Sequence, residues 1–228
     1  MRFMEVPMKS KYLLPLVALL AWPSCLPAQT KLEPVHIVLP KPGYEGTPPN
    51  FLNIPNMEKP SYKERGPFLA PPGVTNVAKG KKVTSSDKEP IIGDLDMVTD
   101  GDNTQIEGNN VELGQGVQWV KIDLAAPHEV YGILFWHYYQ PRVYFSVVVQ
   151  TADDEAFTKN VQTWFNNDTN NKAGQGAGKN LNYVETYEGK LVDCKGVVAR
   201  YVRLFSAGNN ANALNDYVEV EVYGRPPK

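Results

Sequence analysis

An acidic loop near the middle of the chain carries the densest set of hard oxygen donors. It reads D-M-V-T-D-G-D-N-T from Asp96 to Thr104, and Asp100 and Asp102 flank a glycine that permits a tight turn. Ca²⁺ takes about six to eight oxygen ligands from carboxylates and carbonyls on a flexible turn. The run does not fit an EF-hand, because counting from Asp100 places Gln105 where that loop needs glycine and Val111 where it needs glutamate. These residues alone leave two interpretations, a calcium loop and a solvated acidic turn with side-chain capping.

A second candidate is the aromatic run W-H-Y-Y-Q-P-R-V-Y, residues 136–144, which ends an apolar segment and turns at a proline. Sugar recognition needs an aromatic face for the C–H side of the ring and planar donors for pairs of hydroxyls. His137, Tyr138, Tyr139 and Arg142 supply both kinds of group on one predicted loop. In the alternative interpretation the arginine and the last tyrosine only begin a strand, and the tryptophan belongs to the core.

Two polar loops could join a binding rim. Residues 166–180 read N-N-D-T-N-N-K-A-G-Q-G-A-G-K-N, which is long for a loop without apolar pattern in a compact domain. Its glycines do not form a phosphate loop, because no Lys-Ser/Thr follows at the Walker spacing. The second loop contains Asn209 and Asn210. Asparagine amides can bind hydroxyls in pairs, but a flexible surface loop and a simple turn are the respective alternatives.

The sequence offers little for catalysis. It contains no G-x-S-x-G and no H-E-x-x-H motif, and its three histidines, His36, His128 and His137, are too dispersed for a linear zinc motif. The adjacent Asp153 and Asp154 are expected at a strand end. Any fold could still bring two carboxylates together in space, so the missing motifs favour a binding protein without excluding a hydrolase.

The elements that position these residues read as short antiparallel strands. In the segments 201–206 and 217–223, apolar and polar residues alternate with period two, as expected for half-buried strands. Further strands are predicted at 118–124, 130–136, 144–151, 163–166 and 183–187. Many short strands separated by glycine and proline turns favour an all-β sandwich or barrel.

Several motifs follow one another in the order found in a known family. They are N-V-A-K-G-K-K-V-T-S-S (Asn76–Ser86), M-V-T-D-G-D (Met97–Asp102), V-Q-W-V-K-I-D-L (Val117–Leu124), R-V-Y-F-S-V-V-V-Q-T-A-D-D (Arg142–Asp154), A-R-Y-V-R-L (Ala199–Leu204) and E-V-E-V-Y-G (Glu219–Gly224). This series resembles the discoidin family, the coagulation factor 5/8 type C domains, which is related to the family 32 carbohydrate-binding modules. The resemblance covers Asn76–Gly224 and implies a jelly-roll β-sandwich of the galactose-binding-like type.

The resemblance also implies a structural calcium ion. In such modules the acidic loop folds round Ca²⁺, and the first glutamate of the terminal E-x-E-V-Y-G strand completes the ligand shell. In this chain the implied ligands are Asp100, Asp102, Thr104 and Glu219, together with backbone carbonyls near Met97. Calcium is therefore the one cofactor expected.

The N-terminus reads as an export signal. Lys9 and Lys11 form a basic region, residues 12–22 an apolar one, and Ala28 is a plausible last residue before cleavage. The apolar stretch is too short to cross a bilayer core of about 30 Å. Lipidation at Cys25 is the alternative, although Trp22 does not fit the lipobox. We expect an exported protein in the periplasm, the medium or the cell surface.

The chain has 228 residues, and 23 Lys and Arg against 25 Asp and Glu give a net charge of −2. This balance offers no basic face for nucleic acid. Residues 29–75 are rich in proline, and apolar residues between the prolines predict an arm partly tied to the sandwich, with a disordered tether as the alternative. Cleavage after Ala28 would leave Cys194 as the sole cysteine, which we interpret as a core residue.

Together these features predict a signal peptide (1–28), a proline-rich arm (29–75) and one discoidin-like sandwich (76–224). The predicted function is non-catalytic binding of a carbohydrate or glycoconjugate at loop-rim residues His137, Tyr138, Tyr139, Arg142, Asn209 and Asn210, with a structural calcium ion. The alternative is an envelope-associated adhesive or structural protein that binds another protein. No transmembrane span is expected.

Overall fold

The computed structural model describes residues 1, 31–42, 53–59, 63–138 and 142–228, and the compact unit considered below is Lys31–Lys228. The predicted signal peptide, with Cys25 and Ala28, lies outside the described residues, and so does the candidate ligand-binding residue Tyr139.

The secondary structure consists of strands and one short 3-10 helix. In chain order the elements are β1 (Glu33–Pro34), β2 (Leu69–Ala70), β3 (Thr75–Asn76), β4 (Lys82–Ser85), η1 (Leu95–Thr99), β5 (Val111–Leu113), β6 (Gln118–His137), β7 (Val148–Ala152), β8 (Gln162–Asn166), β9 (Lys190–Ser206) and β10 (Asn215–Arg225). The strands β1 and β2 form a pair of their own.

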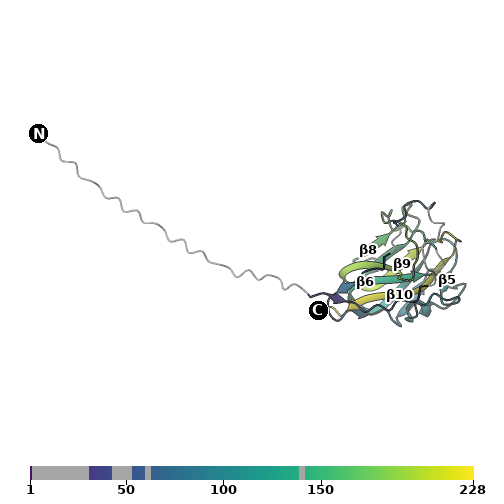
Figure 1. Ribbon diagram of the computed structural model, residues 1–228, viewed down its shortest axis with the longest axis horizontal. Coiled ribbons are helices and arrows are strands. Elements are labelled where there is room, and N and C mark those ends of the chain that lie inside the picture. Colours follow the sequence, from purple (N-terminus) through teal and green to yellow (C-terminus); the bar gives the residue numbers. More distant parts are fainter. Residues whose placement is uncertain (2–30, 43–52, 60–62, 139–141) are drawn as a thin grey trace. The chain divides into compact units, whose positions relative to one another are not determined.

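The other strands form one antiparallel system in the order β3-β10-β6-β9-β7-β8, with β4 paired to β6 and β5 paired to β10. Figure 1 shows the labels β6, β9 and β10 close together within the compact unit. The first part of β6 lies between β4 and β9, and its last part lies between β10 and β9. Between these parts the register with β9 shifts from Asp123 to His128, beside Ala125 with a φ of 68°. The long strand β6 thereby pairs with different neighbours in its first and last parts, β4 and β9 in the first and β10 and β9 in the last.

One main hydrophobic core holds these regions together. It draws buried side chains from β4 to β10, and its members on the central strand β6 include Val120, Ile122, Ile133 and Phe135. Tyr217 and Val220 of β10 enter the same cluster. The alternation of apolar side chains along the strands therefore produces the predicted all-β sandwich.

The predicted strands differ from the observed ones in several places, and the segment 201–206 is only the end of β9, which begins at Lys190. The segments 118–124 and 130–136 belong to the single strand β6, and β7 begins only at Val148. The segment 183–187 is not a strand. Tyr183 and Glu185 are both buried, but the Glu185 nitrogen donates to the Arg142 carbonyl outside any ladder. The buried side chains at alternate positions therefore produced the period-two pattern of a strand, although the backbone of this segment forms no ladder.

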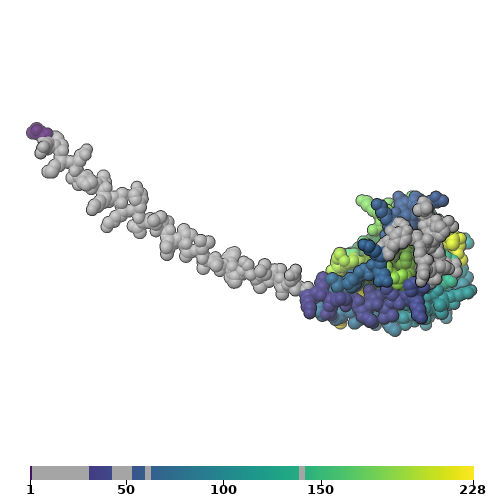
Figure 2. Space-filling model, viewed as in Figure 1, coloured from purple at the N-terminus to yellow at the C-terminus, as the bar shows by residue number. Residues whose placement is uncertain are grey.

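The described part of the proline-rich arm packs on the outer face of β6 and β10. Val35, Ile37 and Phe68 contact a second apolar cluster, whose buried members are Leu134, Trp136, Val218 and Tyr223. Figure 2 shows residues 31–42, in purple, along the surface of the sandwich. Gly132 permits the approach of the arm, because a Cβ there would lie 2.8 Å from the Phe68 ring. The described arm residues thus cover an apolar sheet face.

Candidate binding site at the loop end

The aspartate at the start of β10 organises the end of the sandwich where β6 and β9 finish. Asp216 is 1% exposed, and its Oδ2 accepts hydrogen bonds from Arg142 Nη1 at 3.0 Å and from the Tyr144 hydroxyl at 2.9 Å. Asn110 Nδ2 donates to Oδ1 at 3.2 Å. Burial of a carboxylate is tolerable here because a cation and two neutral donors compensate its lost hydration.

Arg142 connects this buried carboxylate to the surface. Its side chain is 13% exposed, and its guanidinium carbon lies 5.3 Å from the centre of the Tyr138 ring. The Arg142 Nε is buried without a hydrogen-bond partner among the described residues. The loop end therefore presents a planar donor group beside an aromatic face, the combination predicted for sugar recognition.

A second carboxylate lies next to the pair. Glu112 is paired with Asp216 in the β5–β10 register, so the two side chains share one face. Partial burial, and then the negative charge of Asp216, raise the pKa of Glu112 above its usual range. Asp216, Glu112 and Asn110 were not recognised in the sequence, since the contact between Arg142 and Asp216 spans 74 residues and no spacing rule reveals it.

His137 is not on an exposed loop, which corrects the sequence-based expectation. It is the last residue of β6, it is 0% exposed, and its ring stacks on Tyr144 with centroids 4.2 Å apart. Its Nδ1 lies 2.7 Å from Oε1 of the buried Glu185. His137 therefore supports Tyr144, whose hydroxyl holds Asp216, and it presents no atom to solvent.

The two asparagines between β9 and β10 have different positions. Asn209 is 7% exposed, and its side-chain oxygen accepts from the nitrogens of Ala211 and Asn212. Asn210 is exposed, and its Oδ1 accepts from the Val143 nitrogen at 2.7 Å. Asn209 thus shapes its own loop, while Asn210 joins that loop to the Arg142 segment at the surface.

The loop 166–180 uses its polar side chains internally. Asp168 is buried and accepts from the Ser146 hydroxyl and from the Ala173 nitrogen. Asn167 Oδ1 accepts from the Val147 nitrogen at 2.6 Å. These amide and carboxylate groups therefore fold the loop onto the start of β7.

The predicted calcium loop follows η1. Asp100 Oδ1 accepts from the Asp102 nitrogen at 2.7 Å, and Asp102 Oδ1 accepts from the nitrogen and the hydroxyl of Thr104 at 2.9 and 2.6 Å. The hydrogen bonds from Thr104 hold the pKa of Asp102 below its usual value. All three residues are exposed, so their side chains make capped turns at the surface.

Glu219 brings the terminal strand to this loop. It is 0% exposed, its Oε2 accepts from the Gly101 nitrogen at 3.2 Å, and its Oε1 is buried without a hydrogen-bond partner among the described residues. Burial raises the pKa of Glu219 to about 9. Lys79 Nζ lies against Gly101, where a Cβ would be only 2.7 Å from it. A half-satisfied buried carboxylate fits a cation.

The other expected ligands fit less completely. Within the described residues, no group of three or more His, Cys, Asp or Glu side chains is placed to hold a metal ion. A calcium ion bound by Glu219 would therefore need backbone carbonyls of the loop as further ligands.

No protein-family model matches this chain, and no curated protein matches it. Similar solved structures exist. A family 89 glycoside hydrolase from Clostridium perfringens is 18% identical with a TM-score of 0.49, over 66% of this chain and 15% of that one. The match thus spans a small part of that enzyme's length.

Two smaller proteins match over nearly their whole length. A chitosan-binding module from a Paenibacillus chitosanase/glucanase is 20% identical over 66% of this chain and 99% of the module, with a TM-score of 0.43. A fucose binding module from Streptococcus pneumoniae is 18% identical over 65% and 97%, with a TM-score of 0.44. In the part of the chain that is described, no helix is long and apolar enough to span a membrane.

Proposed function

We propose that this chain is an exported, non-catalytic carbohydrate-binding module that binds a glycan at the loop end of its sandwich. The observation that carries the proposal is the Arg142–Asp216 pair, which fixes a guanidinium beside Tyr138 at the surface. Several similar structures are carbohydrate-binding modules, which agrees with this proposal.

The recognition mechanism follows from the chemistry of these groups. Tyr138 offers an aromatic face to sugar C–H groups, and Arg142 offers N–H donors to adjacent hydroxyls. The exposed Asn210 amide lies on the neighbouring loop, which bonds to the Arg142 segment. His137 and Asn209 act behind this surface, where they hold Tyr144 and the 209–212 turn in place.

We further propose that Ca²⁺ binds at the 100–104 loop and has a structural role. The buried Oε1 of Glu219 supports this assignment, because it lacks a hydrogen-bond partner in the described structure. A bound calcium ion would neutralise that carboxylate and tie the acidic loop to β10.

A glycan array with the full chain tests the function, run with calcium in one arm and with chelator in the other. We expect retention on a subset of glycans that Tyr138→Ala removes, because truncating a central aromatic anchor commonly costs about 2 kcal/mol or more. Retention that is unchanged by Tyr138→Ala and by Arg142→Met would contradict this assignment.

A second candidate function is adhesion to another envelope protein. Ile91 and Ile92 are 57% and 43% exposed, and Ile92 is bridged to Glu112 beside the loop end. Exposed apolar side chains next to a polar rim suit a protein partner. Adhesion that free sugars do not inhibit, and that Ile91→Ser abolishes, would favour this function over glycan binding.

A further inference from the structure

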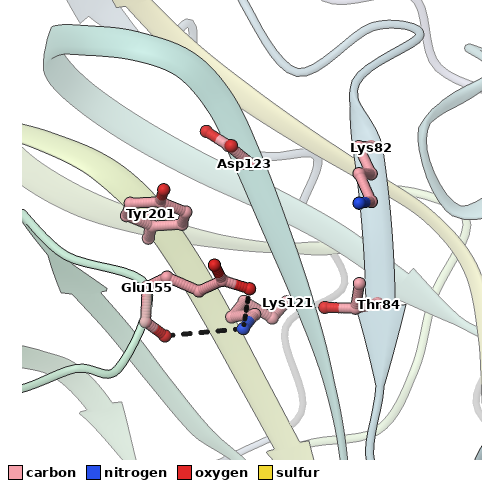
Figure 3. Close-up of a pocket in the computed structure, with 6 residues that line it drawn as sticks. All are labelled: Lys82, Thr84, Lys121, Asp123, Glu155 and Tyr201. Atoms are coloured by element: carbon pink, nitrogen blue, oxygen red, sulfur yellow. Dashed lines mark hydrogen bonds and ion pairs between the residues drawn. The ribbon is translucent and has the colours of Figure 1, made fainter.

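A small polar pocket lies on a sheet face, and it shares no residue with the loop-end site. Its volume is ≈ 60 Å³, and it is lined by Lys82, Thr84, Lys121, Asp123, Glu155 and Tyr201. Figure 3 shows these side chains converging from β4, β6, β9 and the turn after β7. The space admits a few non-hydrogen atoms, which is a ring substituent and not a whole sugar.

The strand register explains why these side chains meet. Lys82 is paired with Asp123 across β4 and β6, and Asp123 is paired with Tyr201 across β6 and β9. Thr84 is paired with Lys121 in the next outward-facing row. The intervening residues of β4 and β6 point into the core, so the period of two places all the polar side chains on one outer face.

The two carboxylates of the pocket already have partners. Asp123 accepts two hydrogen bonds from Arg200, both at 2.8 Å, and these hold the pKa of Asp123 below its usual value. Glu155 Oε1 accepts from Lys121 Nζ at 3.0 Å. Neither carboxylate therefore needs a cation from a ligand.

The donors, by contrast, are in surplus. Lys82 makes no ion pair with any described residue, and the hydroxyl of Thr84 is buried without a hydrogen-bond partner there. With Arg200 at its rim, the pocket has three cations against two carboxylates, on a chain with a net charge of −2. A buried hydroxyl without a partner costs stability unless a ligand or water satisfies it.

The geometry points to this pocket as a second glycan subsite, which binds the negatively charged carboxylate substituent of a sugar. Lys82 Nζ and the Thr84 hydroxyl donate to the anion, and Lys121 exchanges its Glu155 partner for it. Glu155 is 69% exposed on a turn, so it can move aside at little cost. The inference rests on the proposed function in that the anion is carried by a glycan.

The test is specific because two charge variants should change the affinity for the glucuronide in opposite directions. The full, isotope-labelled chain is titrated with methyl β-glucuronide, methyl β-glucoside and sodium sulfate at constant ionic strength, and the amides of β4, β6 and β9 are followed by NMR. The glucuronide should shift the Lys82, Thr84 and Lys121 amides. Lys82→Met should weaken its binding about tenfold or more, and Thr84→Val should weaken it severalfold. Glu155→Gln should strengthen it about threefold, because it removes a competing negative charge.

Lys172→Met is the matched charge control, since Lys172 is an exposed lysine on the 166–180 loop, and it should leave the affinity unchanged. Equal shifts with the glucoside, or weaker binding in Glu155→Gln, would overturn the subsite. Binding of sulfate without the glucuronide would also overturn it, since the pocket would then take free anions only. Lys82→Met should not alter retention on neutral glycans, so failure here is distinguishable from failure at the loop end.

Discussion

The backbone nitrogen of Gly101 donates to Oε2 of Glu219, while Oε1 of the same carboxylate has no hydrogen-bond partner among the described residues. A glutamate of the last strand is thus buried against the acidic loop with half of its acceptor capacity unused. A buried charge in this state is costly unless it is neutralised by a proton or by a cation. The positive charge of Lys79 favours the ionised form of Glu219, and the negative charges of Glu221 and Asp100 oppose it. The contact between Gly101 and Glu219 is therefore the reason to measure whether stability depends on calcium.

We expect calcium to raise the melting temperature of the full chain. A ligand that binds only the native state at a hundredfold excess over its Kd adds about 2.7 kcal/mol to the free energy of unfolding. Glu219→Gln should abolish this response, and in chelator it should be at least as stable as the parent, because the amide needs no proton uptake to be buried, whereas burial raises the pKa of Glu219 to about 9. Glu107→Gln, on an exposed residue of the same loop region, should keep the response. Identical melts of the parent with calcium and with chelator would eliminate the metal site.

Part of this arrangement follows from sequence and part does not. The alternation in 201–206 and 217–223 predicts the end of β9 and most of β10, because period two is a local property of the chain. The D-G-D turn also follows from local residues. The pairing of Arg142 with Asp216 does not, since it depends on the register of strands far apart in the chain. The segment 183–187 was wrongly predicted as a strand, because Tyr183 and Glu185 are buried at alternate positions although the segment pairs with no strand.

His137→Ala should destabilise the protein. The ring is buried against Tyr144, and its removal leaves a cavity and the buried carboxylate of Glu185 without its partner. Such losses cost about 2–4 kcal/mol in the free energy of unfolding, measured by urea titration. The exposed His36 is the control, and His36→Ala should change stability little. A His137→Ala variant with full stability and no glycan binding would instead place this histidine in contact with the ligand.

The surface residues of the loop end should behave differently from its buried ones. Tyr138→Ala and Asn210→Ala should reduce glycan affinity about tenfold or more, and should lower the free energy of unfolding less than a change at a buried position, because Tyr138 is only partly buried and Asn210 is exposed. Asp216→Ala should lower the free energy of unfolding by about 3–5 kcal/mol, since it leaves Arg142 without its buried counter-charge. Calorimetric melts and affinity electrophoresis separate the two effects. If Asp216→Ala melts like the parent, the ion pair does not organise this end.

Glu112 should make stability depend on pH in a predictable direction. Its pKa is raised in the folded state by partial burial and by Asp216, so the folded protein holds that proton more tightly than the unfolded chain. Its favourable contribution is complete below the unfolded pKa of about 4.5 and is lost as the pH rises through the folded pKa. Glu112→Gln should therefore stabilise the protein at pH 7 and have little effect at pH 4. The difference in melting temperature between the parent and Glu112→Gln, measured at each pH, separates the effect of Glu112 from that of the other acids.

The arm should be a structural part of the sandwich. Phe68 packs over Gly132, and with Val35 and Ile37 it contacts the cluster around Leu134 and Trp136. Phe68→Ala should cost about 3 kcal/mol in the free energy of unfolding. Gly132→Ala should displace the same ring, because its Cβ would lie 2.8 Å from Phe68. Both variants should be cleaved faster by protease within residues 63–75 and should bind more of a hydrophobic dye. Leu69→Ala, which alters a half-exposed neighbour on β2, is the matched control, and equal protease sensitivity in all three would show that Phe68 does not anchor the arm.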